Sequence, residues 1–142
     1  MQRLLFDCLP KANQAAQAYF ESARQTVGNL VGQITADPPA TGQRPLEAHD
    51  QAQRAVHGLA WVSTYVNALR EIQHWVSRLS DAGNLSETDQ LIAAIGAGEY
   101  FAQLSSALPM TQLELLRPAD MGCADAAGVM AANESASPHQ WR

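Results

Sequence analysis

Glu71 and His74 are residues of this 142-residue sequence whose types and spacing could bind a metal. They occupy positions i and i+3 of the run "EIQH". Di-iron and di-manganese helical bundles use this spacing on two of their four helices, and they complete the site with a second such pair and two more carboxylates. His49 has Glu47 only two residues before it, on another face of a helix, and the remaining glutamates of the periodic segments stand alone. We therefore interpret Glu71 and His74 as a solvated pair and expect no metal site.

Motifs for nucleophilic catalysis and nucleotide binding are also incomplete. Cys8 and Cys123 lie far apart, follow no metal-ligand spacing and have no base beside them in sequence, so we expect reduced thiols in a cytoplasmic protein. The run "GAGEYF" (96–101) lacks the third glycine of a dinucleotide loop and falls within a helical pattern. Gly96 and Gly98 are therefore interpreted as a smooth patch where another helix packs closely.

A neutral aromatic ridge on the second periodic segment is the remaining candidate site. His57, Trp61 and Tyr65 recur every four residues and share one helix face, and Trp75 lies further along the same segment, off its main apolar stripe. The ridge either packs against a neighbouring helix or partner chain, or forms a ligand pocket together with the glycine patch. Packing is the favoured interpretation, because tryptophan and tyrosine are common in helix cores and interfaces alike.

The composition favours surfaces that another polypeptide covers. The net charge is −5, the pI is about 5.2, and the 9 Lys and Arg residues are scattered, which argues against a nucleic-acid partner. Charged residues make up 16% of the chain, against roughly 25% in an average soluble domain. The polarity comes instead from amide and hydroxyl side chains, which cost less to desolvate than ions. No apolar run reaches the ~20 residues of a membrane span and the N-terminus lacks a signal-peptide pattern, so we expect no membrane contact.

Periodicity predicts three long helices. The first covers 11–34, with Asp7 and Pro10 at its first turn, and the second runs from Pro45 to Asp81 after a Pro/Gly connector. The third starts at the capping box "SETD" (86–89) and continues to about Ala107. Their expected apolar stripes comprise Ala16, Phe20, Ala23, Val27, Leu30 and Ile34; Val56, Leu59, Val62, Val66, Leu69, Ile72, Val76 and Leu79; and Leu91, Ile92, Ile95, Ala102 and Leu104.

A short fourth helix is predicted at "TQLE" (111–114), which repeats the capping signature and precedes "RP". No segment alternates with period two over a useful length, so no sheet is expected. The predicted fold is an all-α antiparallel bundle of three long helices plus this short fourth helix. It forms one domain over residues 1–122, followed by a flexible or loosely docked tail over 123–142, which is rich in small residues without any period.

Three stretches together resemble a known family: "AYFESAR" (18–24), "AVHGLAWVSTYVNALREIQHW" (55–75) and "IGAGEYFAQLSSALPMTQLELLRPADMG" (95–122). They are similar to the N-terminal helical region that precedes the flavin-dependent core in (2S)-methylsuccinyl-CoA dehydrogenases of the acyl-CoA dehydrogenase superfamily. The resemblance covers about residues 11–122. It implies an extension of a cytoplasmic enzyme that oxidises an acyl-CoA and passes electrons from FAD to an electron-transfer partner.

The family's catalytic carboxylate and its FAD- and CoA-binding positions have no counterparts in this sequence, which ends at Arg142. We therefore expect no cofactor in this chain and no catalysis by it alone. The first hypothesis is a non-catalytic helical domain that acts in docking or oligomerisation, with a second copy or a dehydrogenase core as its partner. The alternative is a small helical bundle that binds an acyl or CoA-type ligand.

Overall fold

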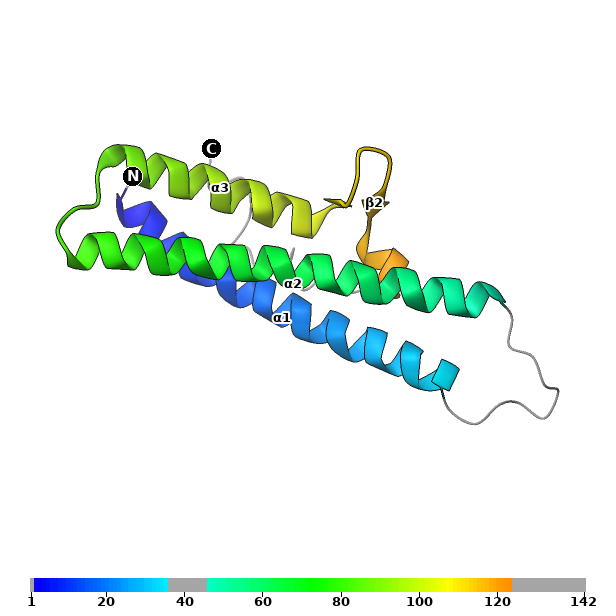
Figure 1. Ribbon diagram of the computed structural model, residues 1–142. Coiled ribbons are helices and arrows are strands. Elements are labelled where there is room, and N and C mark those ends of the chain that lie inside the picture. Colours follow the sequence, from blue (N-terminus) through cyan, green and yellow to red (C-terminus); the bar gives the residue numbers. More distant parts are fainter. Residues whose placement is uncertain (1, 36–45, 124–142) are drawn as a thin grey trace.

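Three helices make up most of the chain, as the all-α prediction requires. The computed structural model describes residues 2–35 and 46–123, and its helices are α1 (Gln2–Thr35), α2 (Leu46–Asp81) and α3 (Glu87–Ser105). Every pair of these helices is in contact, and α2 runs opposite to both α1 and α3 (Figure 1). The predicted tail lies outside the described residues except for Cys123, which is buried.

Helix α1 begins earlier than predicted and contains Pro10 in its interior rather than in its first turn. A proline inside a helix removes one backbone hydrogen bond, so other interactions must stabilise the extra turns. Here Leu5, Cys8 and Leu9 are buried in the core, and this tertiary packing stabilises the helical turns that precede Pro10. Asn13, one turn after the proline, donates side-chain hydrogen bonds to the backbone oxygens of Leu9 and of Leu69 in α2, at 3.2 and 3.1 Å.

The predicted boundaries of α2 and of the start of α3 are confirmed by local signals. Helix α2 ends before Gly83, whose φ of +68° is the left-handed conformation that commonly follows a helix. In the capping box of α3, the Asp89 backbone N–H donates to Ser86 Oγ at 3.1 Å, and the Ser86 backbone N–H donates to the Asp89 carboxylate at 3.0 Å.

The α2 stripe is confirmed along most of its length. Val62, Leu69 and Val76 are buried, but Val56 is 48% exposed. Near Val56 the buried positions belong to the small residues Ala55 and Gly58. The first half of α2 therefore faces the core with a different side from the one predicted.

The face of α3 that enters the core differs from the predicted one. Leu91, Ile92 and Ile95 were expected on its apolar face, yet they are 41%, 56% and 65% exposed. The buried residues of α3 are Gln90, Ala93, Ala97, Phe101 and Leu104, which follow each other at steps of three and four, and of these Leu104 was predicted. Because α3 carries apolar residues on two opposite faces, its periodicity alone does not tell which one faces the other helices.

The predicted fourth helix is wrong, and so is the prediction of no sheet. Residues 108–116 form a hairpin in which β1 (Leu108–Pro109) pairs antiparallel with β2 (Leu115–Leu116). The "TQLE" segment forms the turn of this hairpin. The Met110 backbone N–H closes the turn by donating to the Glu114 backbone carbonyl oxygen at 2.9 Å. Leu113 in this turn is 98% exposed, so a helix here would have had little apolar surface to bury.

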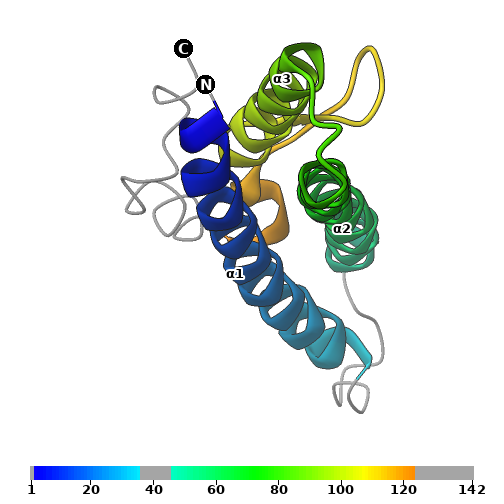
Figure 2. The ribbon, with the colours of Figure 1, turned by 90° about the vertical axis from the view of Figure 1, so that its left-hand side faces the viewer.

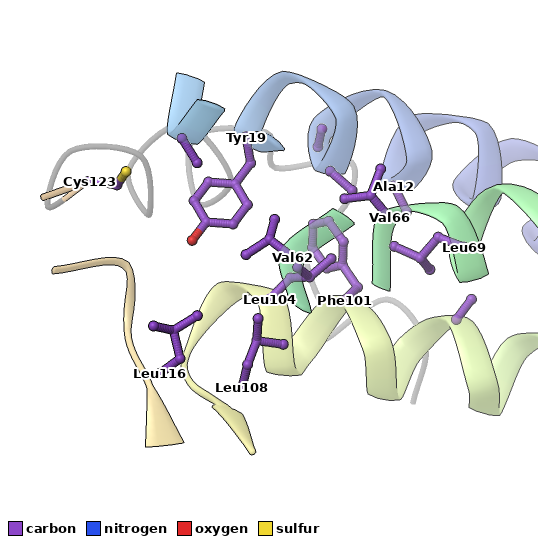
Figure 3. Packing of buried hydrophobic residues seen from close by; sticks show 14 of the residues in the cluster. Ala12, Tyr19, Val62, Val66, Leu69, Phe101, Leu104, Leu108, Leu116 and Cys123 are labelled. Carbon is purple, nitrogen blue, oxygen red and sulfur yellow. The ribbon is translucent and has the colours of Figure 1, made fainter. Parts of the chain in front are cut away.

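A short 3₁₀ helix, η1 (Pro118–Met121), follows the hairpin and packs on both α1 and α2 (Figure 2). The Asp120 carboxylate accepts a hydrogen bond from the Arg117 backbone N–H at 2.7 Å, and Gly122 ends the turn with a φ of +75°. The core forms where this region meets the helices, and side chains from α1, α2, α3 and the hairpin converge there (Figure 3).

Candidate interaction site

The predicted aromatic ridge does share one face of α2, and its first two members contact each other. The Trp61 indole N–H donates a hydrogen bond to His57 Nε2 at 3.2 Å. His57 is exposed and Trp61 is half-buried, which leaves this end of the ridge accessible from outside.

Tyr65, the third member of the ridge, is turned toward α3. Its hydroxyl donates to Gln103 Oε1 at 2.8 Å, and its ring packs edge-to-face on Tyr100 with the ring centroids 5.0 Å apart. Partial burial, and then the neighbouring Tyr100, raise the pKa of the Tyr65 hydroxyl above its ordinary value. Tyr65 therefore connects α2 to α3 within the chain.

Trp75 lies further along α2, and the glycine patch precedes Tyr100 on α3. Trp75 is half-buried and packs against the edge of the core. A Cβ at Gly96 would meet Ile72 Cδ1 at 3.5 Å, an ordinary van der Waals distance, so an alanine would also fit there. Gly98 is half-buried on the same helix. Within the described part of the chain, Trp61, Tyr65 and Trp75 are each only partly buried.

Gly58 is a close-packing position that the sequence reasoning missed. A Cβ at Gly58 would lie 2.6 and 2.7 Å from the two Cδ atoms of Leu116, so the hairpin rests directly on this point of α2. A lone glycine inside a strongly helical pattern was the available signal, because such a glycine usually has a packing reason.

An apolar cleft of about 540 Å³ opens between the C-terminal end of α1 and the N-terminal part of α2. Among the residues that the structure describes, no lysine, arginine or carboxylate lines this cleft, and His57 is the predicted site residue that does. The lining residues are Val31, Ile34, Thr35, His49, Ala52, Gln53, Val56, His57 and Ala60.

A second accessible apolar surface, here called the outer α3 face, consists of Leu91, Ile92 and Ile95. These three side chains lie on the side of α3 opposite to Ala93 and Ala97, which are buried against the other helices.

Glu71 and His74 form an exposed pair on one turn of α2, with His74 Nδ1 3.5 Å from a Glu71 oxygen. Within residues 2–35 and 46–123, no three histidine, cysteine or carboxylate side chains are grouped so that they could hold a metal ion. In the same part of the chain, no helix is both long and apolar enough for a transmembrane span.

Over 124 residues this chain is 38% identical to (2S)-methylsuccinyl-CoA dehydrogenase of Cereibacter sphaeroides. The chain is similar to part of an acyl-CoA dehydrogenase. The match covers 85% of this chain and 21% of the relative, so the resemblance seen in the sequence is confirmed and the chain spans about a fifth of the dehydrogenase's length. No protein-family model matches the chain, and no solved structure matches it either.

The segment 95–122, one of the three that carry the resemblance to the dehydrogenase, has a structural role in this fold. Its residues form the second half of α3, the hairpin and η1, and the buried side chains among them hold this region against α1 and α2. Those side chains are Ala97, Phe101, Leu104, Leu108, Met110, Leu116, Pro118 and Met121. The buried side chains of this segment therefore maintain the shape of the region, whereas Ile95 in the same segment is exposed on the outer α3 face.

Proposed function

We propose that this chain is a non-catalytic helical module of the acyl-CoA dehydrogenase type, an antiparallel bundle that acts by docking onto other polypeptide or by oligomerising. The observation that carries the proposal is its similarity to about a fifth of a dehydrogenase. The partly exposed aromatic ridge and the outer α3 face support it, because apolar patches on a soluble domain mark interaction sites.

The charged pairs of the described residues are consistent with a non-catalytic role. Glu21 with Arg24 and Arg54 with Glu114 are ion pairs between largely solvent-exposed side chains. Exposed pairs of this kind contribute little to stability and have none of the burial that tunes catalytic groups.

The proposed partner is a dehydrogenase core, which would carry FAD and the acyl-CoA substrate, in the cytoplasm. The net charge of −5 disfavours nucleic acid as a partner. A second copy of this chain is the other partner to consider, since two copies could cover one another's neutral surfaces.

Light scattering tests the proposal. The chain is measured alone at micromolar concentration, and then mixed with the Cereibacter sphaeroides dehydrogenase from which the matching segment has been deleted, with bound FAD absorbance as the check that this partner is folded. A stable complex, with the partner or with itself, is the expected result. A chain that remains monomeric and ignores the folded dehydrogenase would contradict the docking function.

The apolar cleft supports a second candidate function, binding of an acyl group. Its volume of about 540 Å³ lies within the range of small-molecule sites, and its lining suits an uncharged aliphatic chain. Thermal shift with a panel of fatty acids and acyl-CoAs tests this function. The melting temperature should rise with at least one chain length, and Val56→Trp, which fills the cleft, should abolish the rise. A flat response across the panel excludes acyl binding.

A further inference from the structure

We infer that the outer α3 face is the surface through which this chain docks on a dehydrogenase core, and that the partner presents an apolar patch bordered by lysine or arginine side chains. This inference rests on the proposed docking function and names the surface and the chemistry of its partner.

The packing of α3 supports the outer α3 face as the docking surface. Ala93 and Ala97 face the core, while Ile92 and Ile95, one helical turn apart, are 56% and 65% exposed on the opposite side. A helix that is apolar on two opposite faces is normally covered on both of them. Among residues 2–35 and 46–123, other elements bury only the inner face of α3, so the outer α3 face is available to a partner.

The charge on α3 supports a partner with basic side chains around its apolar patch. It disfavours a second copy of this chain as that partner. Helix α3 contains three acidic residues and no lysine or arginine. Glu87 and Glu99 are both exposed, and they lie one helical turn before Leu91 and one turn after Ile95. Two copies that packed through this face would bring their acidic residues together, whereas basic side chains around an apolar patch complement it.

Helix α3 is held rigidly enough to present this face in a fixed orientation. Its N-terminus is closed by the capping box between Ser86 and Asp89. Its C-terminal half is attached to α2 by the Tyr65–Gln103 hydrogen bond and by the ring contact with Tyr100. A pre-organised surface loses little conformational entropy on binding, which favours a stable complex.

The experiment measures binding of the full chain to the deleted, FAD-loaded dehydrogenase by isothermal titration calorimetry. The test variant is Ile92→Glu/Ile95→Glu, and the matched control is Leu113→Glu, which changes an exposed aliphatic residue in the turn of the hairpin. Because all three positions are exposed, circular dichroism and thermal melting should show that both variants remain folded. We expect the double variant to weaken binding by about 100-fold and the control by less than about 3-fold.

A second variant tests the charge of the partner. Glu87→Lys/Glu99→Lys should weaken binding by about 10-fold at low salt, and the affinity of this variant should fall less steeply with added salt than that of the unmodified chain. Tighter binding by this variant would show that the rim of the partner is acidic and overturn that part of the inference.

The measurements distinguish failure of the inferred docking surface from failure of the proposed docking function. If the unmodified chain binds the dehydrogenase and the Ile92→Glu/Ile95→Glu variant binds it equally well, docking stands and the outer α3 face is the wrong surface. If the unmodified chain forms dimers that this double variant dissolves, the face binds a second copy and the inferred partner is wrong. If the unmodified chain binds neither, the proposed function itself is overturned.

Discussion

Leu116 of the hairpin lies directly on Gly58 of α2, so that a single added carbon at Gly58 would come within 2.7 Å of both Leu116 methyl groups. Both residues are buried, and Leu116 is only 2% exposed. The fit of the hairpin on α2 therefore depends on the absence of a side chain at one position, even though glycine is a poor residue for a helix interior.

Replacing Gly58 by alanine should destabilise the protein. The gain of roughly 1 kcal/mol in helix propensity is outweighed by overpacking against Leu116, which typically costs about 1–3 kcal/mol. The measurement is the free energy of unfolding in urea.

The matched control is Gly28→Ala in α1, where an added Cβ meets no other atom within 4 Å. This exposed substitution should stabilise the protein by about 0.5–1 kcal/mol. Equal stabilisation by both variants would show that Leu116 does not pack on Gly58.

Ser86→Ala should lower stability by about 1 kcal/mol, because the Ser86 hydroxyl accepts the Asp89 backbone N–H at the start of α3. Thr88→Ala, at an exposed position in the same turn, serves as the control and should change stability by less than about 0.5 kcal/mol. The comparison uses thermal unfolding followed by circular dichroism. If the two variants behave alike, the capping box does not stabilise α3.

The same capping box gives stability a pH dependence at acidic pH. Hydrogen bonds from the Ser86 side chain and then from its backbone N–H lower the pKa of the Asp89 carboxyl. A carboxyl whose pKa is lower in the folded state stabilises the protein above its unfolded pKa, which is about 3.9, and loses this contribution as the pH falls toward the folded value. Unfolding in urea between pH 6 and pH 3 should therefore show a steeper loss for the unmodified chain than for Asp89→Asn.

The sequence predicted the parts of the fold that local signals determine. The Ser86–Asp89 capping box and Gly83 mark the boundary between α2 and α3, and each acts within a few residues of its own position. The hairpin could not be found in this way, because strands of two residues show no alternation, and "TQLE" fits a turn as well as a helix start.

The candidate site shows the same division between local and long-range information. The spacing of His57, Trp61 and Tyr65 correctly predicted one shared helix face, but Tyr65 finds its hydrogen-bond partner, Gln103, 38 residues away. Leu104 was predicted correctly, but the core side of the first half of α3 was not, since only packing against α1 and α2 decides between Ile92 and Ala93.

Tyr65→Phe should lower stability by about 0.5–1.5 kcal/mol, because it removes the hydrogen bond to Gln103 and leaves the ring contact with Tyr100 in place. A double-mutant cycle with Gln103→Ala isolates the interaction, and we expect a coupling energy of about 0.5–1 kcal/mol. Additive effects of the two substitutions would mean that the hydrogen bond between α2 and α3 contributes nothing to stability.

Tyr19 should make the protein less stable at alkaline pH. Its side chain lies in the core near Cys123 (Figure 3), and burial, followed by the nearby thiol, raises the pKa of its hydroxyl well above the ordinary value. The unfolded chain releases this proton near pH 10, whereas the folded chain retains it. The contribution to stability is therefore complete below about pH 10 and is lost as the pH rises further.

The variant Tyr19→Phe tests this prediction, since it keeps the ring in the core and removes the titrating hydroxyl. The free energy of unfolding should fall less steeply for this variant than for the unmodified chain between pH 9.5 and pH 11.5. Cys123, whose pKa burial also raises, is present in both proteins, so the difference between the two slopes belongs to Tyr19. Identical slopes would show that the Tyr19 hydroxyl ionises as readily in the folded chain as in the unfolded one.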